Sequence, residues 1–533
     1  MLSRRNFLVF IYLFCGISLL PSCDQGFSIP FHSEDDTAPT ASSVVEALEI
    51  STQLTPAGAP TATLQPAKLI DVPPSDLRGV IIHFWHNWSG PAGVLMQSLV
   101  EDFNLHNEWG IMVVPVRLNT LDEMTTDIEA ALNTSDEPDL IVGYPHQYLE
   151  WDEIVGLVDL RPYVSDPVWG ISTDEQADFY PVVWEQDVLD GKRLGMPAQR
   201  SAQVLFYNET WAQSLGFRAS PVSPEQFMEQ ACASARQNSD QAENDSQQAE
   251  LTQQSYSTGG LMVSTNYAAI LGWIYSFGGD VIHSPEPGLG QTVYNFGNPQ
   301  IEETFIFLRG LYDQLCAWQP ENQYPISEFI SRQGLFFTGS VTNIPDLADA
   351  FNRTGNHDQW TVIPFPSPST HPAIDVYGPS FVVLPSTPQR QLAAWLLVKW
   401  LLSPSNHALL VEETSALPLR ISALDHLATF QNRYPQWTAA LELFPQGRSE
   451  PLFQSWSTVR WALSDASTQL FRDYFTIDQV PVLIDYLDDT AAELHLGLGS
   501  SRIYPTRTPS PGLTIVPIVS PTSSLTATST RSP

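Results

Sequence analysis

Two kinds of side chain in this sequence could carry chemistry or recognition, namely carboxylates and indole rings. The chain has 59 acidic residues and 15 tryptophans among its 533 residues. A pair of carboxylates performs glycoside hydrolysis, but no spacing singles out one pair here. Indole rings offer apolar area to the C–H faces of a sugar, although a tryptophan more often packs in a core. These residue types are compatible with contacts to sugar rings, and a glycosidase pair hidden among the acidic residues, as in a secreted glycan-degrading enzyme, stays open.

The sequence lacks the motifs of the well-marked enzyme classes. It contains no GxxxxGK[ST] phosphate loop, no HExxH zinc pair, no GxSxG nucleophile elbow and no GxGxxG dinucleotide turn. His83 and His86 lie three apart on an expected strand, where that spacing points them to opposite faces, so they should not share a metal. We expect no catalytic residue, no cofactor and no metal site.

The first 23 residues have the anatomy of an export signal, with a basic start at Arg4 and Arg5 and an apolar run over residues 7–20. Fourteen helical residues rise about 21 Å, less than a hydrocarbon core, so a spanning anchor is the weaker alternative. The start resembles a twin-arginine signal, and the general route remains open. Leu20-Pro21-Ser22-Cys23 resembles a lipobox, which predicts a lipid on Cys23, whereas an ordinary secretory signal would leave Cys23 unmodified.

Two other cysteines, Cys232 and Cys316, belong to the expected folded region. They show no CxxC spacing and no neighbouring histidine pair, which disfavours a metal site. They either form one disulfide or pack as small buried hydrophobic residues.

The chain is strongly acidic, with 24 basic residues and a formal net charge of −35. This charge disfavours nucleic acid and anionic lipid surfaces as partners. Residues 24–76 and 499–533 are rich in Ser, Thr and Pro and poor in aromatic residues, which predicts a disordered tether and a disordered tail. The polar stretch 237–254 is also expected to be a loop or disordered.

Strand and helix patterns alternate between these segments. Strands are expected over residues 80–85, 111–118, 139–143, 203–207, 360–365 and 380–384, and helices over 91–106, 122–133, 224–236 and 389–402. This alternation predicts an α/β fold of two lobes, with ligands at the carboxyl ends of strands and in the cleft between the lobes.

The order of several short motifs over residues 79–496 resembles the extracellular solute-binding proteins of carbohydrate ABC importers. These motifs are Ile82-His83-Phe84-Trp85-His86, Pro138-Asp139-Leu140-Ile141, Gly195-Met196-Pro197, Gly278-Gly279-Asp280 and Tyr377-Gly378-Pro379-Ser380. The resemblance implies the two-lobed type II periplasmic-binding-protein fold, with an interlobe hinge. It implies a first lobe over 77–207 plus 377–425 and a second over 208–376 plus 426–498.

The resemblance also implies a set of ligand-facing residues near strand ends and on two second-lobe helices. They are Trp85, His86, His146, Arg200, Ser201, Tyr267, Trp273, Ser340, Tyr377, Gly378, Trp456 and Arg460. Trp456 and Trp461 either stack on sugar or pack their helix into the core, and Arg460 either contacts ligand or forms a salt bridge.

The expected function is that of a non-catalytic receptor that captures a sugar or oligosaccharide, or a related polyol or glycerol-phosphate compound. It is expected to be a monomer that is lipid-anchored at the outer face of the cytoplasmic membrane and delivers ligand to ABC permease subunits. A metal or peptide receptor is the third hypothesis. The sugar and the cognate permease stay undetermined.

Overall fold

The computed structural model describes residues 69–499 apart from 119–120, 133, 135–136, 247–257, 286–290 and 370. The predicted signal peptide, the lipid on Cys23, most of the predicted tether and the predicted tail lie outside the described residues. Within the described part, no helix is both long and apolar enough to cross a membrane.

The first lobe is built on a five-stranded sheet whose strands follow the order β2-β1-β3-β15-β6. The strands are β1 (Ile81–His86), β2 (Met112–Arg117), β3 (Leu140–Gly143), β6 (Met196–Pro197) and β15 (Ser380–Val383). β1 pairs in parallel with β2 and β3, and β15 runs antiparallel to β3 and β6. The buried face of β1 carries Ile82 and Phe84 into the core.

The second lobe is built on a seven-stranded sheet of order β11-β8-β12-β7-β14-β16, with β13 paired to β7. Its strands are β7 (Ser201–Asn208), β8 (Leu261–Met262), β11 (Ala317–Trp318), β12 (Phe336–Ser340), β13 (Trp360–Ile363), β14 (Ile374–Tyr377) and β16 (Gly447–Ser449). β8, β11 and β12 are parallel, so their carboxyl ends meet at one edge of the sheet. Two hairpins join β4 (Val188–Leu189) to β5 (Lys192–Arg193) and β9 (Ile282–His283) to β10 (Val293–Tyr294).

Helices cover both sheets. In the first part of the chain they are α1 (Gly90–His106), α2 (Leu121–Ala131), α3 (Pro145–Val155), α4 (Arg161–Ser165), α5 (Thr173–Ala177) and α6 (Pro181–Trp184). The middle part has α7 (Glu209–Ser214), α8 (Pro224–Ser246), α9 (Tyr267–Ser276), α10 (Pro299–Asp313), α11 (Ile326–Ile330) and α12 (Ile344–Thr354). The last part has α13 (Pro388–Leu401), α14 (Pro404–Thr414), α15 (Ala428–Arg433), α16 (Pro435–Leu443), α17 (Trp456–Leu470) and α18 (Val480–Gly499).

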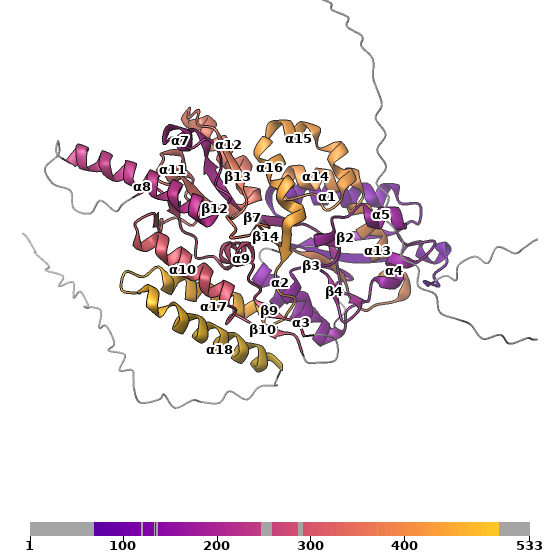
Figure 1. Cartoon of the computed structure of the whole chain (residues 1–533). Helices are drawn as coiled ribbons and strands as arrows, with labels where there is room; N and C mark the ends of the chain where they lie inside the picture. The colour runs from indigo at the N-terminus through magenta and orange to yellow at the C-terminus, as the bar shows by residue number, and fades with distance from the viewer. Residues whose placement is uncertain are drawn as a thin grey trace, which may run out of the picture. The chain divides into compact units, whose positions relative to one another are not determined.

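Local sequence explains where several of these helices begin. Asn266 caps α9 by accepting a hydrogen bond from the backbone N–H of Ala268, and Asn298 caps α10 in the same way. α13 begins with Pro388 at its first position, where a missing N–H costs nothing. α10, α17 and α18 pack together on the second lobe, as Figure 1 shows.

The chain passes between the two sheets at three places. It enters the second sheet between β6 and β7, returns to the first sheet between β14 and β15, and enters the second sheet again before β16. We call the first two of these passages the two crossings. β7 and β14 are paired next to these crossings, through Tyr377 and Ser201. Two neighbouring crossings of this kind form the hinge of a two-lobed binding fold.

Most predicted elements match the observed ones to within about two residues. One prediction was wrong, because residues 237–246 of the supposed loop continue α8. Gln, Ala and Glu in this stretch are good helix formers, so a polar composition does not exclude a solvent-exposed helix. The two cysteines form a disulfide, Cys232–Cys316, which links α8 to the segment before β11.

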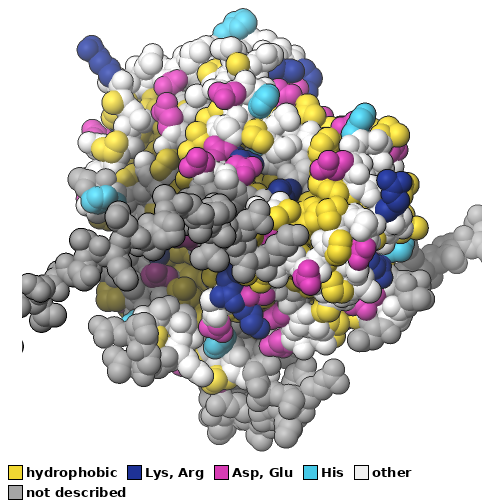
Figure 2. All heavy atoms as spheres, turned by 90° about the vertical axis from the view of Figure 1, so that its right-hand side faces the viewer, with side chains coloured by type: hydrophobic (Ala, Val, Ile, Leu, Met, Phe, Trp, Pro, Cys, Tyr) yellow, Lys and Arg dark blue, Asp and Glu magenta, His cyan; other side chains and the backbone are white. Residues whose placement is uncertain are grey.

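Exposed side chains on the face drawn in Figure 2 include scattered acidic groups with few lysines and arginines between them.

Candidate functional site

A pocket of about 320 Å³ opens at the carboxyl edge of the second sheet. Its walls are the segments that follow the parallel strands β8 and β11, together with Thr338 of β12 and two residues of α17. Its polar lining residues are Ser264, Thr265, Asn266, Gln319, Glu321, Asn322, Gln323, Thr338 and Ser464. Amides and hydroxyls of this kind donate and accept hydrogen bonds equally well, which suits a polyhydroxyl ligand.

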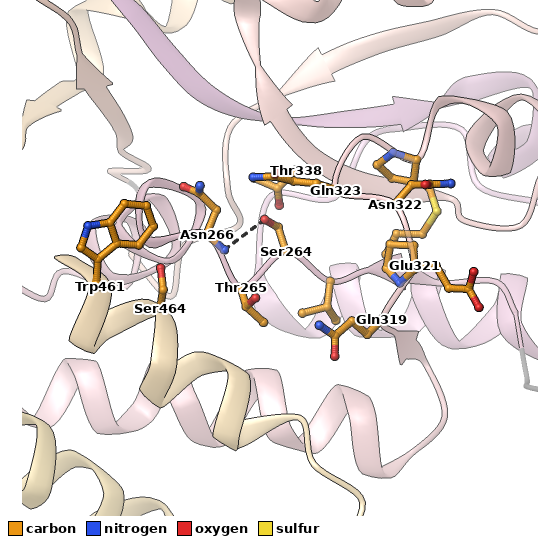
Figure 3. Close-up of a pocket in the computed structure, with 14 residues that line it drawn as sticks. Ser264, Thr265, Asn266, Gln319, Glu321, Asn322, Gln323, Thr338, Trp461 and Ser464 are labelled. Atoms are coloured by element: carbon orange, nitrogen blue, oxygen red, sulfur yellow. Dashed lines mark hydrogen bonds between the residues drawn. The ribbon is translucent and has the colours of Figure 1, made fainter. Parts of the chain in front are cut away.

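Trp461 adds an aromatic ring to the apolar lining of this pocket, which also includes Met262, Val263, Pro320 and Pro325. The side chain of Trp461 is 53% exposed although it is one of the largest apolar groups of the chain. Figure 3 shows the ring on one side of the pocket beside Asn266, with Glu321 and Asn322 on the other side. The Oγ of Ser464, one helical turn further along α17, is buried and has no hydrogen-bond partner among the described residues.

An aromatic cluster continues from Trp461 toward the first lobe. The ring of Tyr267 meets the rings of Trp461 and Trp456 edge to face, at centroid distances of 5.7 and 6.0 Å. The guanidinium group of Arg460 lies 5.4 Å from the Tyr267 ring centroid and 5.2 Å from that of Trp461. Its Nε has no hydrogen-bond partner among the described residues.

Hydroxyl groups from both crossings meet beside this cluster. The Oγ atoms of Ser201 and Ser340 lie 2.7 Å apart, and the Oγ of Ser340 lies 2.8 Å from that of Thr342. Gln203 donates from its Nε2 to the hydroxyl of Tyr377 over 3.0 Å. Burial raises the pKa of Tyr377, so its hydroxyl stays protonated and can donate.

The first lobe contributes the amino end of α3 to the same region. Tyr144 and His146 lie there with their ring centroids 5.8 Å apart. Burial, aided by the positive charge of Arg460, lowers the pKa of His146 to about 3, so the imidazole is neutral. Burial and the nearby Glu450 raise the pKa of Tyr144 to about 12. Both groups therefore offer neutral hydrogen-bonding atoms toward the second lobe.

A larger groove of about 910 Å³ lies between α1 and α13, with Trp109, Trp169 and Trp400 in its walls. Arg78 and Trp109 in its lining precede β1 and β2, so the groove lies at the amino ends of these strands. Ligands of open α/β sheets bind at the opposite, carboxyl ends. The region between the lobes is therefore the stronger candidate for a binding site.

A family profile for the bacterial extracellular solute-binding proteins matches residues 98–445, more than half of the chain. The chain belongs to this family. Among curated relatives, the sn-glycerol-3-phosphate-binding periplasmic protein UgpB of Salmonella typhimurium is 26% identical over 152 residues. That match covers 27% of this chain and 32% of the relative, so it spans about a third of the relative's length.

Solved structures of similar fold cover most of the described chain. The cyclic alpha-maltosyl-1,6-maltose binding protein of Arthrobacter globiformis matches with a TM-score of 0.64 at 16% identity, over 78% of this chain and 99% of that one. The sugar-binding protein MalE of Xanthomonas citri matches with a TM-score of 0.64 at 18% identity, over 79% and 98%. At these identities the likeness shows the shared fold, which is the expected two-lobed one.

Seven of the predicted site residues of this solute-binding protein come together between the lobes. They are His146, Ser201, Tyr267, Ser340, Tyr377, Trp456 and Arg460. Trp456 is only 1% exposed and donates from its Nε1 to Glu450 over 2.8 Å, so it supports the cluster from behind.

Four other predicted site residues of the solute-binding protein pack against, or bond to, other parts of the protein instead of joining this cluster. Trp273 is 2% exposed and packs against Phe227 and Phe365 in the second-lobe core. His86 is buried beside Phe84, and burial lowers its pKa to about 4. Trp85 packs on a small first-lobe cluster, and the buried guanidinium group of Arg200 bonds to Asp187 and Ser380.

Gly378, the remaining predicted residue, follows Tyr377 at the second crossing with a φ of 155°. A Cβ atom there would lie 2.1 Å from the carbonyl oxygen of Gln199. The close approach of the two crossings therefore requires glycine at this position.

The sequence analysis missed the polar lining of the pocket. Ser264, Thr265 and Asn266 follow the short strand β8, and Gln319 follows β11. A polar run directly after an apolar strand was the available signal, but two-residue strands are too short to recognise by period. Among the described residues, no group of three or more His, Cys, Asp or Glu side chains could hold a metal ion.

Proposed function

We propose that this chain is the substrate-binding receptor of an ABC importer and that it captures a sugar or oligosaccharide between its lobes. The observation that supports this proposal most is the pairing of the exposed Trp461 ring with a pocket lined mainly by amides and hydroxyls, with Glu321 as its one carboxylate. A sugar ring presents an apolar face and a rim of hydroxyls, and this pocket offers a partner for each.

In this proposal the ligand first contacts the second lobe and the lobes then close about the two crossings. Tyr144 and His146 would reach the ligand from the first lobe, opposite Arg460. The neutral imidazole can accept or donate one hydrogen bond, as sugar hydroxyls require. Closure would present the loaded receptor to permease subunits in the membrane, and transport would draw on ATP hydrolysis elsewhere.

We also propose that the chain acts at the outer face of the membrane, held there by a lipid on Cys23. Two or more acyl chains on one cysteine give stable anchoring, which a single chain does not. Mass spectrometry of the intact purified protein tests this point. A mass that includes acyl chains at Cys23 supports it, and an unmodified cysteine contradicts it.

The test of the receptor proposal is a thermal-shift screen of the purified full chain against maltose, maltotriose, cellobiose and longer oligosaccharides. A ligand at a hundred times its dissociation constant adds about 2.7 kcal/mol to the free energy of unfolding. At least one saccharide should raise the melting temperature without being cleaved. No shift across the panel, or release of hydrolysis products, contradicts the proposal.

A further inference from the structure

Two carboxyl groups lie on one face of the second sheet, next to the region between the lobes. Asp375 is on β14, and its Cα partner on β16 is Arg448. Glu450 follows Arg448 by two residues and Tyr377 follows Asp375 by two, so the four side chains share a face. Asp375 has no exposed surface and Glu450 is partly buried. Burial raises the pKa of both carboxyl groups, and the charge of Glu450 raises the pKa of Asp375 further, as expected of neighbouring acids.

Most oxygens of these two carboxyl groups lack a hydrogen-bond partner among the described residues. Neither oxygen of Asp375 has a hydrogen-bond partner among the described residues, and the same holds for the Oε1 of Glu450. Only the Oε2 of Glu450 accepts a bond, from Trp456. A buried carboxylate without a partner is costly, so such groups are paired, protonated or bound to a cation.

Two arginines adjoin these acids, Arg448 by strand pairing and Arg460 through its charge, and both are engaged in other contacts. Arg448 donates to Asp280 over 2.6 Å and to the carbonyl oxygen of Gly279 over 2.9 Å, and its guanidinium group stacks on Tyr275. Arg460 stacks on Tyr267 and Trp461 and forms no ion pair with a described residue. Its charge lowers the pKa of Glu450 only partly, because burial still raises that pKa to about 7.

Space for one small group adjoins Glu450. A cavity of about 20 Å³ is lined by Tyr144, Gln186, Tyr377, Ser449 and Glu450, among others. About 10–15 Å³ is enough for one water-sized group. The hydroxyls of Tyr144 and Tyr377 and the carboxylate of Glu450 are oxygen ligands of the kind that an ammonium group or an alkali-metal ion accepts.

We propose that Asp375 and Glu450 form a subsite for one small monovalent cation, which is either the ammonium group of an amino-sugar ligand or a free alkali-metal ion. The cation compensates the charge of the two carboxylates when the lobes close. If the cation is the ammonium group of a bound ligand, the subsite rests on the proposed function. If the cation is a free alkali-metal ion, the subsite is independent of that function.

The first arm of the test is calorimetric titration of the full chain with glucosamine oligomers, which carry free amines, and with their N-acetylated counterparts of the same length and linkage. At about pH 7.5 the free-amine series should bind at least about tenfold more tightly, which corresponds to about 1.4 kcal/mol. Glu450→Gln should abolish this ratio. Glu442→Gln, which changes an exposed acid on α16, should preserve it.

The second arm measures melting temperatures of the unliganded full chain in equal concentrations of sodium, potassium and N-methylglucamine chloride. A free-ion subsite predicts a melting temperature about 2 °C higher in one alkali salt than in N-methylglucamine chloride, because the ion binds only the folded chain. This difference should vanish in Asp375→Asn and in Glu450→Gln and persist in Glu442→Gln.

Either positive arm supports the cation subsite and identifies the source of the charge. Equal binding of the two oligomer series, together with equal melting temperatures in the three salts, overturns the subsite and leaves the proposed function standing. If no saccharide binds at all, the proposed function fails, and the salt series alone decides the subsite.

Discussion

The guanidinium group of Arg200 and the carboxylate of Asp187 form an ion pair of 3.2 Å in which neither side chain has exposed surface. The hydroxyl of Ser380 donates to both oxygens of the same carboxylate, over 2.8 and 2.9 Å, and Tyr148 donates to one of them. Arg200 also donates to the carbonyl oxygen of Pro379. This network joins the two crossings, so it holds the hinge of the binding protein together.

Arg200→Ala should therefore lower the free energy of unfolding by about 3–5 kcal/mol, because it leaves Asp187 buried without its partner. Urea denaturation checks this value. Arg161→Ala is the control, since Arg161 pairs with Asp159 at the solvent-exposed surface and its removal should cost far less stability. Equal losses in the two variants would contradict the role assigned to the buried pair.

Trp456 and Trp461 should respond differently to truncation. Trp456→Ala should cost about 3–5 kcal/mol of stability, because the ring is buried against Tyr267 and Tyr294. Trp461→Ala should change stability by no more than about 0.5 kcal/mol, because the ring is half exposed. Thermal unfolding of both variants is the measurement, and a reversed order would show that the two rings have been misassigned.

The disulfide Cys232–Cys316 closes a segment of 84 residues in the second lobe. Replacing both cysteines by serine should lower the free energy of unfolding by about 2–5 kcal/mol, chiefly because the unfolded chain gains freedom. A reducing agent should lower the melting temperature of the natural chain toward that of the variant. If the reducing agent left the melting temperature of the natural chain unchanged, the result would argue against this disulfide.

The stability of the chain should depend on pH through Glu450. Its pKa is raised from 4.5 to about 7 in the folded state, mainly by burial. The folded state therefore binds the proton more tightly, so the stabilisation is complete below about pH 4.5 and is lost as the pH rises through about 7. Glu450→Gln cannot ionise and should lack this loss.

Urea denaturation of both proteins across this pH range, with N-methylglucamine chloride as the only salt, isolates the effect. Buried histidines such as His146 titrate in both proteins, so their contribution cancels in the difference. Parallel stability curves for the two proteins would show that Glu450 titrates normally.

The fold was largely predictable from the sequence because its strands and helices are long enough to show their period. β1, α1 and α13 were expected within one residue of their observed ends. The end of α8 was predicted too early, because its polar, solvent-exposed last part lacks the apolar period by which an amphipathic helix is recognised.

The candidate site was only partly predictable. Tyr267 and Arg460 could be placed in it from motif order, and the structure puts their side chains in contact. Arg200 was predicted to face the ligand, whereas its buried side chain pairs with Asp187, because an arginine near a cleft looks the same in sequence in either situation. Asp375 gave no signal either, since its burial depends on pairing with a strand more than seventy residues later.

The central claim is that the chain binds a sugar between its lobes without cleaving it. Calorimetric titration of the natural chain and of Trp461→Ala with the saccharide that gives the largest thermal shift tests this claim most directly. We predict saturable binding by the natural chain, no release of product, and an affinity at least about tenfold weaker in the variant. Unchanged affinity in Trp461→Ala, or hydrolysis of the saccharide, would contradict the account.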